Sequence, residues 1–355
     1  MGLARMSACL NNSVGFRIVI PFVLVKVLPG FPGVGYLAKI FAAAAIAVCA
    51  SCVAMRPTSA APLPPSYLVV DSQTGYVLIE QNAREKRQVA SLTKIATACV
   101  VLDWAEKKGG DLNQLATVSE AAFVGVEKNE IGWQVGDAVS LRDLLYAALV
   151  QSDNLAANVL ANRVGETLEV IAPAASNAKV TPTTAFVAQM NALAKQLGMD
   201  RTRFVNPSGF DYKERPMPYS TAIDLARLTR YAMNKASFRF YVSQREREIS
   251  FNRGGKQLHA LLKTTNDLLG TNGIDGVKTG QTGYAGECLI LSANRPSEVI
   301  KNGENSATIF RRHLIVVILG SNDRFGDGER LVRQGWQLYD QWAGAGRLVD
   351  PKKML

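Results

Sequence analysis

The sequence predicts an α+β fold in which an antiparallel sheet, flanked by helices, is interrupted by a mostly helical insertion. β-Rich runs occur near residue 70 and again after about residue 245, and apolar residues at three- to four-residue spacing fill the region between them. Strands and helices therefore do not alternate one by one, as a doubly wound parallel sheet would require. With 355 residues and 48% hydrophobic content, the chain can bury a substantial core.

The first sixty residues differ in kind from the rest. They contain five basic residues, no acidic residue and two apolar stretches. The second stretch, IFAAAAIAVCASCVAM, follows Lys39 and precedes the small residues TSAAP, which predicts cleavage after Ala60. We expect residues 1–60 to be a signal peptide or an N-terminal membrane leader, and the protein to be exported to the periplasm or another extracytoplasmic part of the cell envelope. An uncleaved leader would associate it with the membrane.

The exported part begins with strands and a helix. Two β-rich runs in YLVVDSQTGYVLIEQN (67–82) flank a turn sequence, which predicts a hairpin. The segment ASLTKIATACVVLDWAEKKGG (90–110) predicts a helix that starts near Ser91 and ends at the glycine pair. Its middle is apolar nearly all round, so we expect it to be buried between layers.

The remaining elements follow from periodicity. Helices are predicted at 140–150, 154–165, 184–199, 221–234 and 328–342, and strands at 247–253, 256–262, 287–294 and 311–320. We expect one domain over 61–345, with a helical lobe at about 111–235. A tail over 346–355 leaves no room for a separate C-terminal β-domain.

Composition excludes several classes of protein. Only Cys99 and Cys288 lie outside the leader, and each sits in an apolar run, so we expect two buried thiols rather than a disulfide scaffold. Two histidines, His259 and His313, provide too little for a histidine triad or a metal site, and we expect no metal and no cofactor. No basic and aromatic cluster indicates nucleic-acid binding.

The helix predicted at 90–110 begins with a serine and a lysine three residues apart. Residues at this spacing share a helix face, so the Ser91 hydroxyl and the Lys94 amine can touch. A serine becomes a good nucleophile when a base takes its proton. A lysine serves as that base only if burial or a neighbouring cation lowers its pKa. The same spacing recurs in the loop sequence at 176–179, so this motif alone is weak evidence.

A second motif, Ser152-Asp153-Asn154, stands between two helical runs. Either it caps the second helix, or it places a hydroxyl and an amide at a cleft. A third motif, Lys278-Thr279-Gly280, occurs at a predicted strand edge. Either it is a solvated turn, or the lysine provides positive potential while Thr279 and Thr282 bind a carboxylate and a backbone N–H binds an oxyanion.

These three motifs in this order are the signature of active-site-serine penicillin-binding proteins and β-lactamases. From about Tyr67 to Trp342 the sequence resembles the D-alanyl-D-alanine carboxypeptidase family, the low-molecular-mass penicillin-binding proteins of peptidase family S11. The blocks FVNPSGFD, PYSTAIDLARL and TNDLLGTNGIDGVKTGQTGYAGECLILSA also carry the resemblance. It implies a β-lactamase/transpeptidase-like fold, with 61–345 as the catalytic domain, and a role in peptidoglycan biosynthesis and cell shape.

The resemblance also implies a role for each motif. Ser91 would attack the carbonyl between the two terminal D-alanines of a peptidoglycan stem peptide, and Lys94 would accept its proton. Ser152 and Lys278 would pass a proton to the leaving D-alanine, and water would hydrolyse the acyl-enzyme. β-Lactams would acylate Ser91 as covalent inhibitors. The backbone N–H groups of Ser91 and Gln281 would form the oxyanion hole. The residues that bind substrate would be Asn154, Thr279, Gly280, Gln281 and Thr282.

Two departures from the family leave alternatives open. Many carboxypeptidases carry an arginine where this sequence has Thr265, and the chain ends soon after its final helix, as in D,D-endopeptidases that cleave peptidoglycan crosslinks. Endopeptidase activity is therefore the main alternative to carboxypeptidase activity. A β-lactamase needs a glutamate that GETLEV (165–170) does not place suitably. An inactive peptidoglycan-peptide binder would have no need for a buried base.

Overall fold

The computed structural model describes residues 63–168, 181–211, 217–304 and 306–355. They belong to one compact unit, residues 62–355. The predicted leader, its cleavage site and the loop sequence at 176–179 lie outside the described residues.

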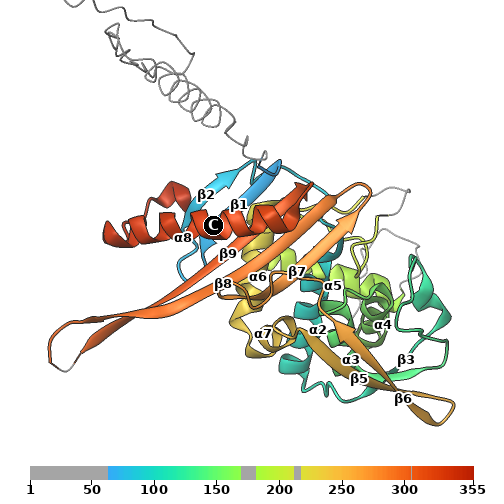
Figure 1. Cartoon of the computed structure of the whole chain (residues 1–355). Coiled ribbons are helices and arrows are strands. Elements are labelled where there is room, and N and C mark those ends of the chain that lie inside the picture. The colour runs from blue at the N-terminus through green and yellow to red at the C-terminus, as the bar shows by residue number, and fades with distance from the viewer. Residues whose placement is uncertain (1–62, 169–180, 212–216, 305) are drawn as a thin grey trace, which may run out of the picture. The chain divides into compact units, whose positions relative to one another are not determined.

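A five-stranded antiparallel sheet organises this unit (Figure 1). The predicted hairpin at 67–82 is confirmed, and its first strand also pairs with a strand from the end of the chain. The two halves of the sheet, far apart in sequence, therefore meet along one ladder. In the spatial order β2-β1-β9-β8-β7, the strands are β2 (Val77–Gln81), β1 (Ser66–Asp71), β9 (Ala307–Ser321), β8 (Gly286–Lys301) and β7 (Ile274–Thr282).

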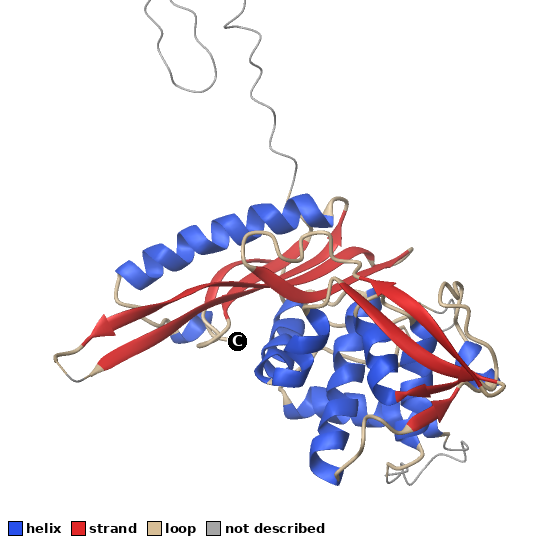
Figure 2. Ribbon diagram, turned by 60° about the horizontal axis from the view of Figure 1, so that its bottom comes forward, coloured by secondary structure: helices blue, strands red, loops and turns tan. Residues whose placement is uncertain are grey.

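Both faces of this sheet are covered (Figure 2). Leu68 and Val70 point into the core shared with the helical block, whereas Tyr67 and Val69 point toward α8 (Arg324–Gly344). Strands that are buried on both faces need no polar alternation. This explains the continuous apolar runs of β8 and β9, as well as the fully buried pattern of β1.

The helical block confirms the predicted helices within one or two residues at most ends. α2 is buried nearly all round, as expected, and a short 3₁₀ turn, η1 (Ala90–Thr93), precedes it. α7 was not predicted, because seven residues are too few to show a helical period. The helices are α2 (Lys94–Lys108), α3 (Leu141–Leu149), α4 (Asn154–Gly165), α5 (Pro182–Gln196), α6 (Ala222–Asn234) and α7 (Ala236–Val242).

A second sheet corrects the sequence interpretation. The strands predicted at 247–253 and 256–262 do form, but they do not join the main sheet. They pair instead with two three-residue strands from the insertion, which are too short to leave a period-two pattern. The inserted lobe thus contains a sheet of its own. Its strands are β3 (Leu115–Thr117), β4 (Ala138–Ser140), β5 (Glu246–Arg253) and β6 (Lys256–Lys263), in that order.

Cys99 and Cys288 are both buried and free, as the sequence predicts. Within the described residues, no three side chains of the metal-binding types gather into a group that could hold a metal ion. No described helix is long and apolar enough to cross a membrane.

Gly335 lies where α8 crosses the main sheet. A substitution at this position shows how closely the helix packs on the sheet. A Cβ at this position would lie 2.7 Å from Val69 Cγ1 and 3.1 Å from Leu314 Cδ1. We predict that Gly335→Val lowers the free energy of unfolding by about 1–3 kcal/mol, because both neighbours are fully buried and packed. Gly344→Ala, in the same helix but with open space around the added Cβ, should not lower the Tm. Thermal unfolding followed by circular dichroism measures both, and equal Tm values would contradict the close packing.

Candidate active site

The amine of Lys94 is fully buried at the start of α2. Its Nζ lies 2.8 Å from Ser91 Oγ, so the expected contact is present, although Ser91 belongs to η1 rather than to the α-helix. Nζ also lies 2.6 Å from Asn154 Oδ1 and 2.9 Å from the carbonyl oxygen of Ser208. Burial lowers the pKa of Lys94 to about 7, and the nearby Asp153 carboxylate acts in the opposite direction.

These three contacts suit an uncharged amine. A neutral lysine has two N–H donors and one lone pair. The oxygens of Asn154 and Ser208 only accept, so they can take both N–H bonds. Ser91 Oγ, 2.8 Å from Nζ, is the one neighbour of the three with a proton to give, so in the neutral form its hydroxyl can donate to the lone pair that remains. This is the arrangement that a general base requires.

The carbonyl of Ser208 is a contact that sequence reasoning missed. The following residue, Gly209, has φ +79°, and a Cβ there would lie only 1.9 Å from the carbonyl oxygen of Ala90. Glycine alone therefore lets this loop lie against η1. Thr97, one turn along α2, donates to the carbonyl that precedes Ser208 (2.6 Å) and holds the loop in place. The glycine in NPSGFD indicated that the backbone approaches another segment closely at this point, but the sequence did not show which segment.

The Ser152-Asp153-Asn154 motif combines the two explanations that the sequence left open. Asp153 caps α4, since its carboxylate accepts from the N–H of Ala156 at 2.6 Å. Ser152 and Asn154 flank this cap and line the same cavity as Ser91. Capping thus fixes the start of α4, and it thereby aims Asn154 at Lys94.

Lys278, on β7, is as deeply buried as Lys94. Its Nζ donates to the carbonyl oxygen of Thr279 at 2.9 Å. Burial, followed by the nearby charges of Lys94 and Arg324, lowers its pKa well below the ordinary lysine value. The motif predicts that Lys278 provides positive potential, and the resemblance predicts that it shares in a proton relay. A lowered pKa makes the buried ammonium a stronger acid than an exposed lysine, which is compatible with the relay.

β7 lies directly against η1. A Cβ on Gly280 would lie 3.0 Å from the backbone N of Ser91, so this glycine allows the strand to reach the serine. The backbone N–H groups of Ser91 and Gln281 therefore lie on neighbouring segments. Arg324, at the start of α8, donates to the carbonyl oxygen of Gly280 at 3.2 Å. No sequence signal indicated Arg324, because it stands outside every motif.

The threonines after Lys278 have different partners. Thr279 Oγ1 lies 2.5 Å from Thr265 Oγ1, so the residue that departs from the expected family pattern contacts this threonine. Thr282 donates its hydroxyl proton to Asp211 and accepts from the N–H of Ala285. Its only proton is thus engaged, whereas the hydroxyl pair formed by Thr265 and Thr279 keeps one proton to donate.

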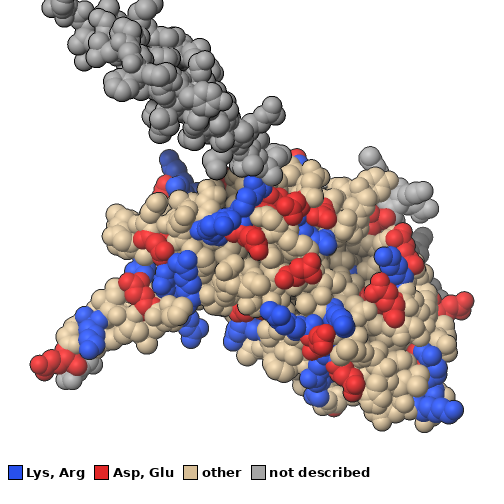
Figure 3. All heavy atoms as spheres, in the orientation of Figure 1, with Lys and Arg blue, Asp and Glu red and all other residues tan. Residues whose placement is uncertain are grey.

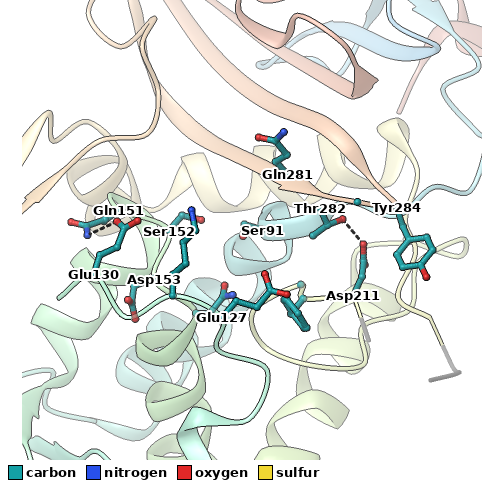
Figure 4. A pocket seen from close by; sticks show the side chains of 15 residues that line it. Ser91, Glu127, Glu130, Gln151, Ser152, Asp153, Asp211, Gln281, Thr282 and Tyr284 are labelled. Atoms are coloured by element: carbon teal, nitrogen blue, oxygen red, sulfur yellow. Dashed lines mark hydrogen bonds between the residues drawn. The ribbon is translucent and has the colours of Figure 1, made fainter. Parts of the chain in front are cut away.

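A cavity of about 680 Å³ opens beside Ser91 (Figure 4). In this view Ser152 and Gln151 lie on one side of Ser91, and Thr282, Asp211 and Tyr284 lie on the other. Lys94 and Lys278 lie beneath the surface. Of the predicted site residues, those that line the cavity are Ser91, Ser152, Asn154, Gln281 and Thr282.

Comparison with known proteins decides the family. The model of the D-alanyl-D-alanine carboxypeptidase family, Peptidase_S11, matches residues 54–301. The chain belongs to this family. It is 30% identical to the D-alanyl-D-alanine carboxypeptidase DacC of Escherichia coli, over 78% of this chain and 62% of that protein. It is 32% identical to a D-alanyl-D-alanine endopeptidase of Pseudomonas aeruginosa, over 76% of each chain.

Solved structures of the family share the fold. The DD-transpeptidase of Streptomyces K15 superposes with a TM-score of 0.64 at 26% identity, and the alignment covers 79% of this chain and 99% of that one. Penicillin-binding protein D2 of Listeria monocytogenes, in its ampicillin-bound form, gives a TM-score of 0.59 at 28% identity, with coverage of 77% and 97%. The α+β, transpeptidase-like fold expected from the sequence is confirmed.

Backbone strain in this S11 site offers a stability test. Ser152 has φ +66°, in the left-handed region that disfavours any residue with a Cβ. We predict that Ser152→Gly raises the free energy of unfolding by about 1 kcal/mol, whereas Ser152→Ala, which keeps the Cβ, does not. Urea unfolding of both variants and the wild type measures the difference. Equal stability of the two variants would contradict strain at this position.

Proposed function

We propose that this S11 protein is a serine D-alanyl-D-alanine carboxypeptidase that removes the terminal D-alanine from peptidoglycan stem peptides. The observation that carries the proposal is the contact between the buried Lys94 amine and the Ser91 hydroxyl beside the cavity. A lysine whose pKa is about 7 is uncharged in a large fraction of molecules at neutral pH, so it can take the serine proton as the nucleophile attacks.

The remaining residues divide the other steps between them. Ser91 Oγ forms a bond to the carbonyl carbon, and the N–H groups of Ser91 and Gln281 stabilise the oxyanion. Ser152 and Lys278 pass a proton to the nitrogen of the departing D-alanine. Lys278 suits this relay because burial lowers its pKa, so its ammonium releases a proton more easily than that of an exposed lysine. Asn154 holds the substrate amide through its side-chain NH₂, because its oxygen is bonded to Lys94.

The terminal carboxylate would bind at Thr279 and Thr265. This pair retains one hydroxyl proton, whereas the proton of Thr282 is given to Asp211. The role expected for Thr282 thus becomes structural, since it joins Asp211 to the turn between β7 and β8. Arg324, which donates to the adjacent Gly280 carbonyl, keeps positive potential beside this position.

Endopeptidase activity on crosslinked peptides is the second candidate. Thr265, a short neutral side chain, stands where the family pattern predicts an arginine. Without that positive charge, the site should prefer substrates with a free terminal carboxylate less strongly. The similarity to the Pseudomonas aeruginosa endopeptidase over 76% of each chain also supports it. We keep the terminal reaction first, because the hydroxyl pair still offers a donor.

Two other functions, β-lactamase activity and peptide binding without catalysis, have less support. A β-lactamase needs a glutamate to activate the water that deacylates the enzyme. Glu166 pairs with Arg163 at the exposed end of α4 and does not line the cavity, and Glu169 lies outside the described residues. A peptide binder without activity would gain nothing from two buried amines, since burying each costs free energy.

Ser91 would attack the carbonyl carbon of a β-lactam as it attacks that of the substrate. The ampicillin-bound form of the Listeria monocytogenes penicillin-binding protein supports this expectation. Since peptidoglycan lies outside the cytoplasm, the enzyme would act in the cell envelope, exported through residues 1–60 and membrane-associated if that leader is retained.

Covalent labelling tests the proposed nucleophile. We predict that a fluorescent penicillin labels the wild type and that Ser91→Ala abolishes the labelling, because the bond to Oγ can no longer form. Ser119→Ala, a serine outside the cavity, is the matched control and should label normally. Undiminished labelling of Ser91→Ala would exclude Ser91 as the nucleophile.

The products formed from defined muropeptides distinguish the carboxypeptidase from the endopeptidase. Release of free D-alanine from monomeric pentapeptide supports the carboxypeptidase, and conversion of crosslinked dimers alone supports the endopeptidase.

A further inference from the structure

Asp153, the middle residue of the second motif, has no step in the proposed reaction, yet it lies next to the base. Its side chain is 8% exposed, and in Figure 4 it lies beside Ser152. It also precedes Asn154, whose Oδ1 lies 2.6 Å from Lys94 Nζ. Among the ion pairs of the described residues, none joins this carboxylate directly to Lys94, because the amine is bonded to three other oxygen atoms. The carboxylate therefore acts on the amine through space.

The helix that Asp153 caps holds the carboxylate in place. Oδ1 accepts from the N–H of Ala156 at 2.6 Å, at the start of α4. Burial raises the pKa of Asp153, but this N–H, the nearby charge of Lys94 and the Trp133 indole act in the opposite direction. Backbone N–H bonds and a helix N-terminus both favour the ionised form of a carboxylate. The cap thus fixes a negative charge beside the base.

Burial alone would leave Lys94 a weak base. Fully buried lysines can have pKa values of about 5–6. A base that weak takes a serine proton poorly, because general bases work best when their pKa is near the working pH. The pKa of Lys94 is about 7, and the Asp153 carboxylate raises it against the effect of burial. The carboxylate therefore restores part of the proton affinity that burial removes.

Other titratable groups face this pair. Lys278, on β7, repels a charge on Lys94, and Asp211 follows the loop that bonds to the amine. Glu130, an exposed residue of the cavity wall, opposes the ionisation of Asp153. Elsewhere, basic and acidic side chains are interspersed on the face shown in Figure 3, where water and salt screen them. Asp153 is the carboxylate whose buried charge acts on Lys94.

We propose that Asp153 is a positioning residue for the proposed reaction: its carboxylate, fixed as the cap of α4, stabilises a proton on Lys94 and keeps this amine basic enough to deprotonate Ser91. The inference rests on the proposed function and deepens it, because it assigns the strength of the base to one residue. Asp153 acts through Lys94 and needs no contact with the substrate.

Asp153→Asn separates the charge from the cap. Asparagine caps helices as well as aspartate does, so the Tm should stay close to that of the wild type. The titration midpoint of Lys94, followed by NMR of ¹³C-labelled lysine, should fall by about one pH unit, because the amide does not stabilise the added proton. The acid limb of the kcat/KM profile for D-alanine release should move down by the same amount. Its plateau should fall about threefold, because the base is weaker.

Two further variants assign the effect. Asp153→Ala loses the charge and the cap, so it should show the same fall in the Lys94 midpoint together with a lower Tm. Glu130→Gln removes an exposed carboxylate from the same side of the cavity, where Gln151 donates to it at 3.4 Å, and should keep the wild-type midpoint.

The outcomes separate this inference from the proposed function. An unchanged Lys94 midpoint in Asp153→Asn would overturn the inference, while D-alanine release by the wild type would leave the carboxypeptidase assignment standing. A midpoint that falls in Asp153→Ala but not in Asp153→Asn would assign the effect to the cap and overturn the role of the charge. An equal fall in Glu130→Gln would overturn the assignment to Asp153. If the wild type releases no D-alanine, the proposed function fails and the inference fails with it.

Discussion

The structure depends on one buried amine held between three oxygen atoms. Lys94 Nζ contacts a side chain of its own turn, the first residue of α4 and a loop carbonyl far along the chain. Each contact requires a separate part of the fold to be in place. An unpaired buried ammonium would be very costly, so the fold stabilises the neutral form and thereby creates a base. Removing any one contact affects both packing and proton affinity.

Two non-glycine residues near the site adopt left-handed backbone conformations: Ala90, which precedes Ser91, and Ser152, which precedes the capping residue Asp153. Such conformations persist only where the surroundings impose them. Here the contact of β7 with η1 and the capping of α4 by Asp153 do so. Rigid elements thus hold Ser91 and Asn154 in position, and the free energy spent on this strain is offset by the apolar cores on the two faces of the main sheet.

Sequence reasoning predicted what local patterns encode. The helices with a clear apolar period were found, with ends that differ from the observed ones by up to four residues, and the spacing of Ser91 and Lys94 predicted their contact. Partners far apart along the chain were not predictable: β5 and β6 looked like strands of the main sheet because periodicity identifies a strand but not its neighbour. The Ser208 carbonyl, Arg324 and the bond from Thr282 to Asp211 were missed for the same reason. The lowered pKa of Lys278 depends on burial, which a short motif does not reveal.

The charge state of Lys94 in the free protein tests the central claim most directly. Lysine side chains labelled with ¹³C at Cε can be titrated by NMR, with the Lys94 resonance assigned by its absence in Lys94→Arg. The account predicts a midpoint near pH 7, far below the value of about 10.4 for exposed lysines. A midpoint near 10 would mean that the amine is charged at neutral pH and cannot take the proton of Ser91, which would contradict the account.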